Sequence, residues 1–141
     1  MYLESFCVIL RAMITDKVKR MRVLLADDQS KVRSALRLLL EQQPGLRVVS
    51  EAAGAEDMLA QVEATQPDLV LLDWELPGLR TDDRLSALRR LCPRLKVIAL
   101  SGQLEARRAA LTAGADGFVS KGDPPEQLLT TLRAVSAGST D

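Results

Sequence analysis

The segment Pro67-Asp-Leu-Val-Leu-Leu-Asp-Trp-Glu-Leu-Pro-Gly78 decides the fold. Its run Leu69-Val-Leu-Leu72 is apolar at every position, which is typical of a strand buried on both faces of a parallel sheet. An acidic residue, Asp73, follows the run directly. A strand of this kind needs helices over both faces, so the flanking segments are expected to alternate between helices and further strands.

That alternation runs through the chain from Met21 onward. Apolar runs predict strands, and helical spacing of apolar residues predicts helices between them. The expected strands are 22–26, 46–50, 69–72, 95–100 and 117–120, and the alternation within 46–50 suits an edge position. The expected helices are one from Val32 to Leu40, ended by Gln43-Pro44-Gly45, then 55–65, 83–91, 104–113 and a last one ending at Gly138. Five β–α units with short connections predict a single doubly wound α/β domain with helices on both faces of a parallel sheet.

Two helix ends have recognisable chemistry. Gly114 is expected to stop the helix 104–113. The last helix is expected to be capped by Asp123, to have Pro124 at its first position, and to use Glu126 to complete a capping box.

Composition excludes several classes of function. The 141 residues suit one domain, and 19 Lys plus Arg balance 19 Asp plus Glu, which argues against a dedicated nucleic-acid binder. The chain has no His, so serine-protease triads, His-ligated zinc and a phosphohistidine role are excluded. No GxGxxG, P-loop or GxSxG motif is present. Cys7 and Cys92 form no CxxC motif and are expected to be reduced thiols. The sequence shows no membrane span and no export signal, so we predict a cytoplasmic protein.

Polar residues follow four of the five expected strands, namely Asp27-Asp28, Asp73, Ser101 and Lys121. In such sheets ligands bind beyond the carboxyl ends of the strands, although strands also end in polar residues simply because loops are wet. Three crowded carboxylates repel one another unless a cation joins them, and oxygen-only ligands favour Mg²⁺ or Mn²⁺. Lysine and serine side chains suit phosphoryl oxygens. A carboxylate nucleophile beside a metal is the arrangement for forming an aspartyl phosphate.

Four segments together resemble the receiver domain of two-component response regulators, over about residues 21–138. They are Leu25-Ala-Asp-Asp-Gln29, Pro67–Gly78, Val97-Ile-Ala-Leu-Ser-Gly102 and Ala113-Gly-Ala-Asp-Gly-Phe-Val-Ser-Lys121. Two further segments, Glu41-Gln-Gln-Pro-Gly-Leu-Arg-Val-Val49 and Pro124-Pro-Glu-Gln-Leu-Leu129, are similar to the NarL/FixJ-type subgroup. Its members usually carry a C-terminal helix-turn-helix DNA-binding domain.

The resemblance implies a flavodoxin-like fold with strand order 2-1-3-4-5 and a phosphorylation-activated signalling switch, regulatory rather than enzymatic. Asp73 would accept a phosphoryl group from a sensor histidine kinase. The implied Mg²⁺ ligands are Asp28, Asp73 and the backbone carbonyl of Glu75, with Asp27 acting through a metal-bound water. Ser101 and Lys121 would hold the phosphoryl group, and Ser101 and Phe118 would form the switch pair, Phe118 being otherwise a plain core residue.

Three positions depart from the wider family. Gly122 stands where a proline is common, so no cis Lys-Pro bond carries over, and Trp74 and Glu75 are bulkier or more acidic than frequent counterparts. Two other classes stay open: a degenerate receiver that only binds partners, and an aspartyl-nucleophile phosphatase with Glu75 as general acid. The length leaves no room for the cap insertion of such phosphatases.

Residues outside the receiver segment carry separate expectations. Residues 1–20 place Tyr2, Leu3, Phe6 and other apolar side chains on one half of a helical wheel, which predicts an amphipathic helix and a homodimer contact. The alternative is a misplaced start codon, because Met21 opens a complete receiver. Residues 139–141 are expected to be the chain end or the start of a linker. DNA would then be contacted only through a C-terminal output domain that this chain lacks.

Overall fold

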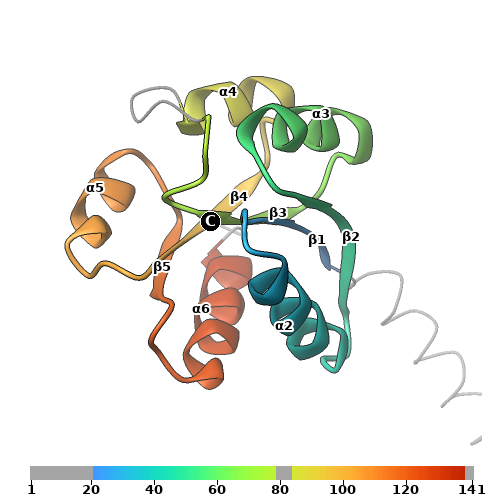
Figure 1. The fold of residues 1–141 in the computed structure, drawn as a ribbon. Coiled ribbons are helices and arrows are strands. Elements are labelled where there is room, and N and C mark those ends of the chain that lie inside the picture. The colour runs from blue at the N-terminus through green and yellow to red at the C-terminus, as the bar shows by residue number, and fades with distance from the viewer. Residues whose placement is uncertain (1–20, 79–83, 139–141) are drawn as a thin grey trace, which may run out of the picture.

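The computed structural model describes residues 21–78 and 84–138 of the chain. Strands and helices alternate along it (Figure 1). The elements are β1 (Met21–Ala26), α2 (Ser30–Glu41), β2 (Leu46–Ala52), α3 (Ala55–Thr65), β3 (Leu69–Asp73), α4 (Arg84–Leu91), β4 (Lys96–Ser101), α5 (Ala106–Thr112), β5 (Gly117–Ser120) and α6 (Pro125–Gly138). The predicted amphipathic helix 1–20 and the chain end 139–141 lie outside the described residues.

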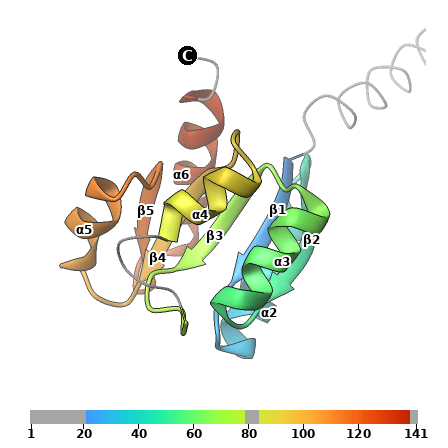
Figure 2. The ribbon, with the colours of Figure 1, turned by 90° about the horizontal axis from the view of Figure 1, so that it is seen from above.

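The strands form one parallel sheet in the order β2-β1-β3-β4-β5, which confirms the predicted flavodoxin-like topology. Figure 2 shows the strands side by side, with β2 and β5 at the two edges. The central strand β3 is buried at all five positions, as its unbroken apolar run predicts. Because every strand runs in the same direction, their carboxyl ends meet at one edge of the sheet.

Helices cover both faces of the sheet and bury two hydrophobic layers (Figure 1). Alternate residues of one strand serve opposite layers, because successive side chains of a strand point to opposite faces. Thus Val70 and Leu72 pack under α3, α4 and α5, whereas Leu69 and Leu71 pack under α2 and α6. Each of these side chains is at most 1% exposed, and such burial is worth about 1.5–3 kcal/mol per side chain.

The expected start of the last helix is wrong. α6 begins at Pro125, so the second proline of the Pro124-Pro125 pair occupies the first helical position. Asp123 does not act as the predicted cap, because its carboxylate accepts a hydrogen bond from the backbone N–H of Ser120 (3.1 Å). The backbone N–H of Asp123 in turn donates to the carbonyl of Ser120 (3.0 Å). Asp123 therefore closes the β5–α6 turn, and no capping box forms with Glu126.

The other boundaries differ from expectation by small amounts. α3 and β5 have their predicted ends, and the other strands gain or lose one or two residues. α5 begins at Ala106 instead of residue 104, and it stops as predicted before Gly114, whose φ of +106° suits a residue without Cβ. Of the predicted helix 83–91, residues 84–91 form α4, and residue 83 lies outside the described residues. No helix within the described ranges has both the length and the apolar character needed to cross a bilayer.

Candidate functional site

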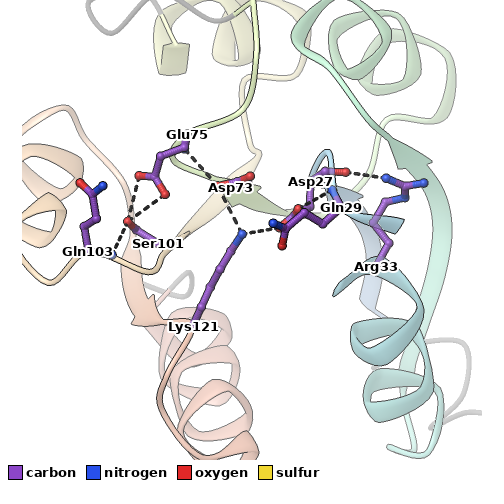
Figure 3. Close-up of polar contacts among 8 residues, drawn as sticks. All are labelled: Asp27, Gln29, Arg33, Asp73, Glu75, Ser101, Gln103 and Lys121. Atoms are coloured by element: carbon purple, nitrogen blue, oxygen red, sulfur yellow. Dashed lines mark hydrogen bonds and ion pairs between the residues drawn. The ribbon is translucent and has the colours of Figure 1, made fainter. Parts of the chain in front are cut away.

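The carboxyl edge of the sheet brings together the side chains that the sequence placed there. Asp27, Asp73 and Ser101 are the buried polar side chains of the described residues, at 1%, 2% and 0% exposure. They follow or end β1, β3 and β4, and Lys121 reaches them from the end of β5 (Figure 3). Buried polar groups are costly without partners, so this concentration at one edge marks the site.

Lys121 pairs with two of the carboxylates. Its Nζ lies 2.8 Å from Asp27 Oδ2 and 3.5 Å from Asp73 Oδ1. Burial acts to lower the pKa of Lys121, but its hydrogen bond to Asp27 and the negative charges of Asp73 and Asp27 outweigh that effect and raise the pKa. Lys121 is therefore held as a cation at the centre of the site.

Asp73 lies where its negative charge is disfavoured. Its Oδ1 accepts a hydrogen bond from the backbone N–H of Glu75 (3.0 Å). Burial is the largest influence and raises the pKa of Asp73, with the charges of Asp27 and Glu75 acting the same way; the Glu75 N–H and Lys121 oppose them without reversing the shift. A buried acid with a raised pKa beside a lysine is typical of a functional site.

Asp27, Asp28 and Asp73 fit a divalent cation. Each offers a carboxylate oxygen, and these oxygens lie within 4.8 Å of one another. Three carboxylates face one lysine here, so negative charge is in excess, and an oxygen-ligated cation would balance it. Asp27 already uses Oδ1 to accept from the N–H of Gln29 (2.9 Å) and Oδ2 to pair with Lys121, whereas Asp28 is exposed at the rim.

Sequence reasoning missed Arg33. From α2, its Nη1 donates to the backbone carbonyl of Asp27 (2.6 Å) and its Nε to Glu51 Oε1 of β2 (3.0 Å), and Figure 3 shows it beside Asp27. The guanidinium thus ties the turn after β1 to the neighbouring strand. The sequence does offer one indication of this contact: Arg33 lies one turn into the helix that follows Asp27 and Asp28.

The sequence also missed the contact between the side chains of Glu75 and Ser101. The Ser101 hydroxyl lies 2.9 Å from Oε2 and 3.1 Å from Oε1 of Glu75. The backbone N–H of Gln103 donates to the same hydroxyl oxygen (3.0 Å). Figure 3 shows this group on one side of Asp73 and the Lys121–Asp27 pair on the other.

Phe118, the predicted switch partner of Ser101, lies within the hydrophobic layer beneath α3, α4 and α5 and is 8% exposed. In the sheet it is paired with Ala99, two residues before Ser101. The structure places Phe118 in the core close behind the site, and its switch role stays a prediction.

Comparison with known proteins identifies the family. Residues 23–133 match the response regulator receiver domain. The chain is 36% identical over 118 residues to the nitrate/nitrite response regulator protein NarL of Escherichia coli strain K12, a match covering 82% of this chain and 55% of that protein. The chain thus spans about half the length of the curated relatives it matches.

Two solved structures share the fold over most of their length. A two-component response regulator of the LuxR family from Aurantimonas sp. SI85-9A1 has a TM-score of 0.77 and 31% identity, covering 84% of this chain and 86% of that one. The isolated receiver domain of RcsB from Salmonella enterica serovar Typhimurium, solved in the presence of the phosphomimetic BeF₃⁻, has a TM-score of 0.76 and 25% identity, covering 84% and 90%. The chain therefore belongs to the response regulator receiver domain family, within its NarL/FixJ-type, LuxR-related subgroup.

Proposed function

We propose that this receiver domain is a phosphorylation-activated switch of a two-component system, with Asp73 as the phosphoryl acceptor. The observation that carries the proposal is the buried Asp73 carboxylate, which lies 3.5 Å from Lys121 and within one acidic cluster with Asp27 and Asp28. A nucleophile, a phosphoryl-binding cation and a set of metal-ligating oxygens are the parts that phosphoryl transfer to a carboxylate requires.

The transfer uses the two oxygens of Asp73 differently. Oδ1 is held by the Glu75 N–H and by Lys121, so we assign Oδ2 as the attacking atom. The bond from Oδ2 to phosphorus forms as the bond from phosphorus to the imidazole nitrogen of a histidine kinase breaks, and the imidazole takes the electron pair. Lys121 and Ser101 would donate to the phosphoryl oxygens.

A divalent cation, Mg²⁺ or Mn²⁺, would be held by Asp28, Asp73 and the backbone carbonyl of Glu75. Asp27 would act on it through a bound water, since both Asp27 oxygens already contact protein groups. When bound, the cation supplies positive charge that offsets the phosphoryl oxygens.

The biological setting follows from the same proposal. A sensor histidine kinase would donate the phosphoryl group, and the protein would be located in the cytoplasm. An output domain or a partner would receive the signal and regulate transcription. DNA would be contacted only through a C-terminal output domain. A homodimer would form through residues 1–20 or on activation by phosphorylation. The free, buried Cys92 thiol fits a reducing compartment.

Incubation with acetyl phosphate and Mg²⁺ tests the proposal, with released phosphate and protein-bound phosphoryl groups both counted. A switch binds one phosphoryl group per chain and releases phosphate slowly. A degenerate receiver binds none, and a phosphatase releases many equivalents without accumulating an adduct; either result would contradict the proposal.

A further inference from the structure

The Ser101 hydroxyl both donates and accepts a hydrogen bond in this structure. A hydroxyl has one proton to donate, and the Gln103 N–H already donates to its oxygen (3.0 Å), so the proton is directed to the Glu75 carboxylate. Ser101 is 0% exposed, so water does not compete for that proton. Contact with a phosphoryl oxygen on Asp73 therefore requires Ser101 to leave Glu75.

Glu75 contacts both Asp73, the proposed phosphoryl acceptor, and Ser101. The backbone N–H of Glu75 donates to Asp73 Oδ1 (3.0 Å), while its side chain accepts from Ser101 (2.9 Å). Glu75 is held by the acceptor through its main chain and holds the switch residue through its carboxylate (Figure 3). No other acidic side chain among the described residues accepts a hydrogen bond from the Ser101 hydroxyl.

We propose that Glu75 is a positioning residue that holds Ser101 in the inactive arrangement, and that its carboxylate competes with the phosphoryl group for the Ser101 hydroxyl. This inference rests on the proposed function. The hydrogen bond between Ser101 and Glu75 must break before Ser101 can donate to the phosphoryl group. Its free energy therefore reduces the free energy gained when Ser101 binds the phosphoryl group.

A second action of Glu75 has to be separated from this one. A carboxylate near the phosphoryl group also repels it through space, whatever Ser101 does. The two actions differ in their dependence on Ser101, because repulsion persists when the hydroxyl is removed and competition does not. A double-mutant cycle over both residues therefore distinguishes them.

The experiment measures the affinity of the full chain for beryllofluoride at saturating Mg²⁺, followed by the fluorescence of Trp74, the single tryptophan. The variants are Glu75→Ala, Glu75→Gln, Ser101→Ala and the two double variants. Glu105→Gln is the matched control, because Glu105 is an exposed carboxylate that precedes α5 and makes no capping hydrogen bond.

Glu75→Ala is expected to raise the affinity about fivefold, which is within the range of one ordinary net hydrogen bond, because Glu75 is an exposed residue. Glu75→Gln should give a smaller gain, because the amide oxygen still accepts from Ser101, and Glu105→Gln should give none. In the Ser101→Ala background, removal of Glu75 should change the affinity less than twofold.

An equal gain from Glu75→Ala with and without Ser101 would overturn the competition and leave only charge repulsion. Unchanged or weakened affinity in the Glu75 variants of the Ser101 protein would overturn it as well. Failure of the wild type to bind beryllofluoride would instead contradict the proposed function, and this inference with it.

Discussion

The ammonium group of Lys121 lies 2.8 Å from Asp27 Oδ2 and 3.5 Å from Asp73 Oδ1, so the lysine is closer to Asp27 than to the proposed phosphoryl acceptor Asp73. Asp27 is 1% exposed, and its carboxylate forms an ion pair with Lys121. We therefore expect Lys121 to have two roles: it stabilises the acidic edge of the sheet, and it donates to a phosphoryl group on Asp73.

Lys121→Met should destabilise the protein, because it leaves the buried Asp27 carboxylate without its cation. We expect a loss of about 2 kcal/mol in the free energy of unfolding, less than for a fully buried pair because Lys121 is partly exposed. Mg²⁺ should restore most of that loss, since the variant site has more uncompensated negative charge. Urea unfolding with and without Mg²⁺ measures both effects. Lys31→Met, at an exposed lysine of α2, is the control, and equal stability of the two variants would contradict this role.

Asp73→Asn should stabilise the metal-free protein at neutral pH. Burial raises the pKa of Asp73 above its usual 3.8, so between that value and the folded value the folded protein binds more protons than the unfolded chain. The free energy of unfolding of the wild type therefore falls as pH rises through this window and stays lower above it. The advantage of Asp73→Asn should be absent at low pH, grow through the window and then level off. Thermal unfolding of both proteins over a pH series measures it; a constant difference at every pH would contradict the shifted pKa.

Arg33→Lys should weaken Mg²⁺ binding by about tenfold, although Arg33 is not expected to touch the metal. Its guanidinium holds the backbone carbonyl of Asp27 (2.6 Å) and Glu51 (3.0 Å) at once, and lysine lacks the fork needed for both. Arg37→Lys is a matched control, because Arg37 also pairs with Glu51 (3.1 Å) but does not contact Asp27.

Mg²⁺ titration followed by Trp74 fluorescence gives the affinities, since Trp74 adjoins Asp73 in sequence and is 5% exposed. Asp28→Asn, which removes a proposed ligand, should abolish most of the response. Equal affinities for Arg33→Lys and Arg37→Lys would show that the Asp27 contact does not position the metal site, and a full response in Asp28→Asn would show that Asp28 is not a ligand.

Gly117→Ala should destabilise the packing of α6 on β5. A Cβ at Gly117 would lie 2.9 Å from Thr131 Cγ2 and 3.1 Å from Val135 Cγ2, and the Thr131 hydroxyl is held by the carbonyl of Gln127 (2.9 Å). Overpacking of this kind costs about 1–3 kcal/mol. Gly102→Ala meets no atom within 4 Å and should change stability little. Urea unfolding of both variants checks the difference, and comparable losses would contradict the packing.

The family resemblance predicted the order of the strands in the sheet, whereas local patterns in the sequence predicted the strands themselves and the polar residues that follow them. The all-apolar run 69–72 identifies a central strand, and parallel strands place their terminal polar residues at a common edge. The predicted start of α6 was wrong because Pro124 and Pro125 both suit a first helical turn. The choice between them depends on the Ser120–Asp123 turn, which includes the last residue of β5.

The site contacts that were missed depend on side-chain conformations across the sheet. Ser101 and Glu75 are 26 residues apart, and Arg33 and Glu51 are 18 apart, so spacing along the chain carries no signal for either pair. Which neighbour a carboxylate or guanidinium chooses is decided by packing and by competing partners, and these appear only in three dimensions.

Intact-mass measurement after incubation with acetyl phosphate and Mg²⁺ tests the central claim, that Asp73 is the phosphoryl acceptor, most directly. Wild type should gain the mass of one phosphoryl group, and the gain should vanish when the divalent cation is chelated. Asp73→Asn keeps the shape of the side chain but removes the nucleophile, so it should gain nothing. A stable adduct on Asp73→Asn at the wild-type level would contradict the claim.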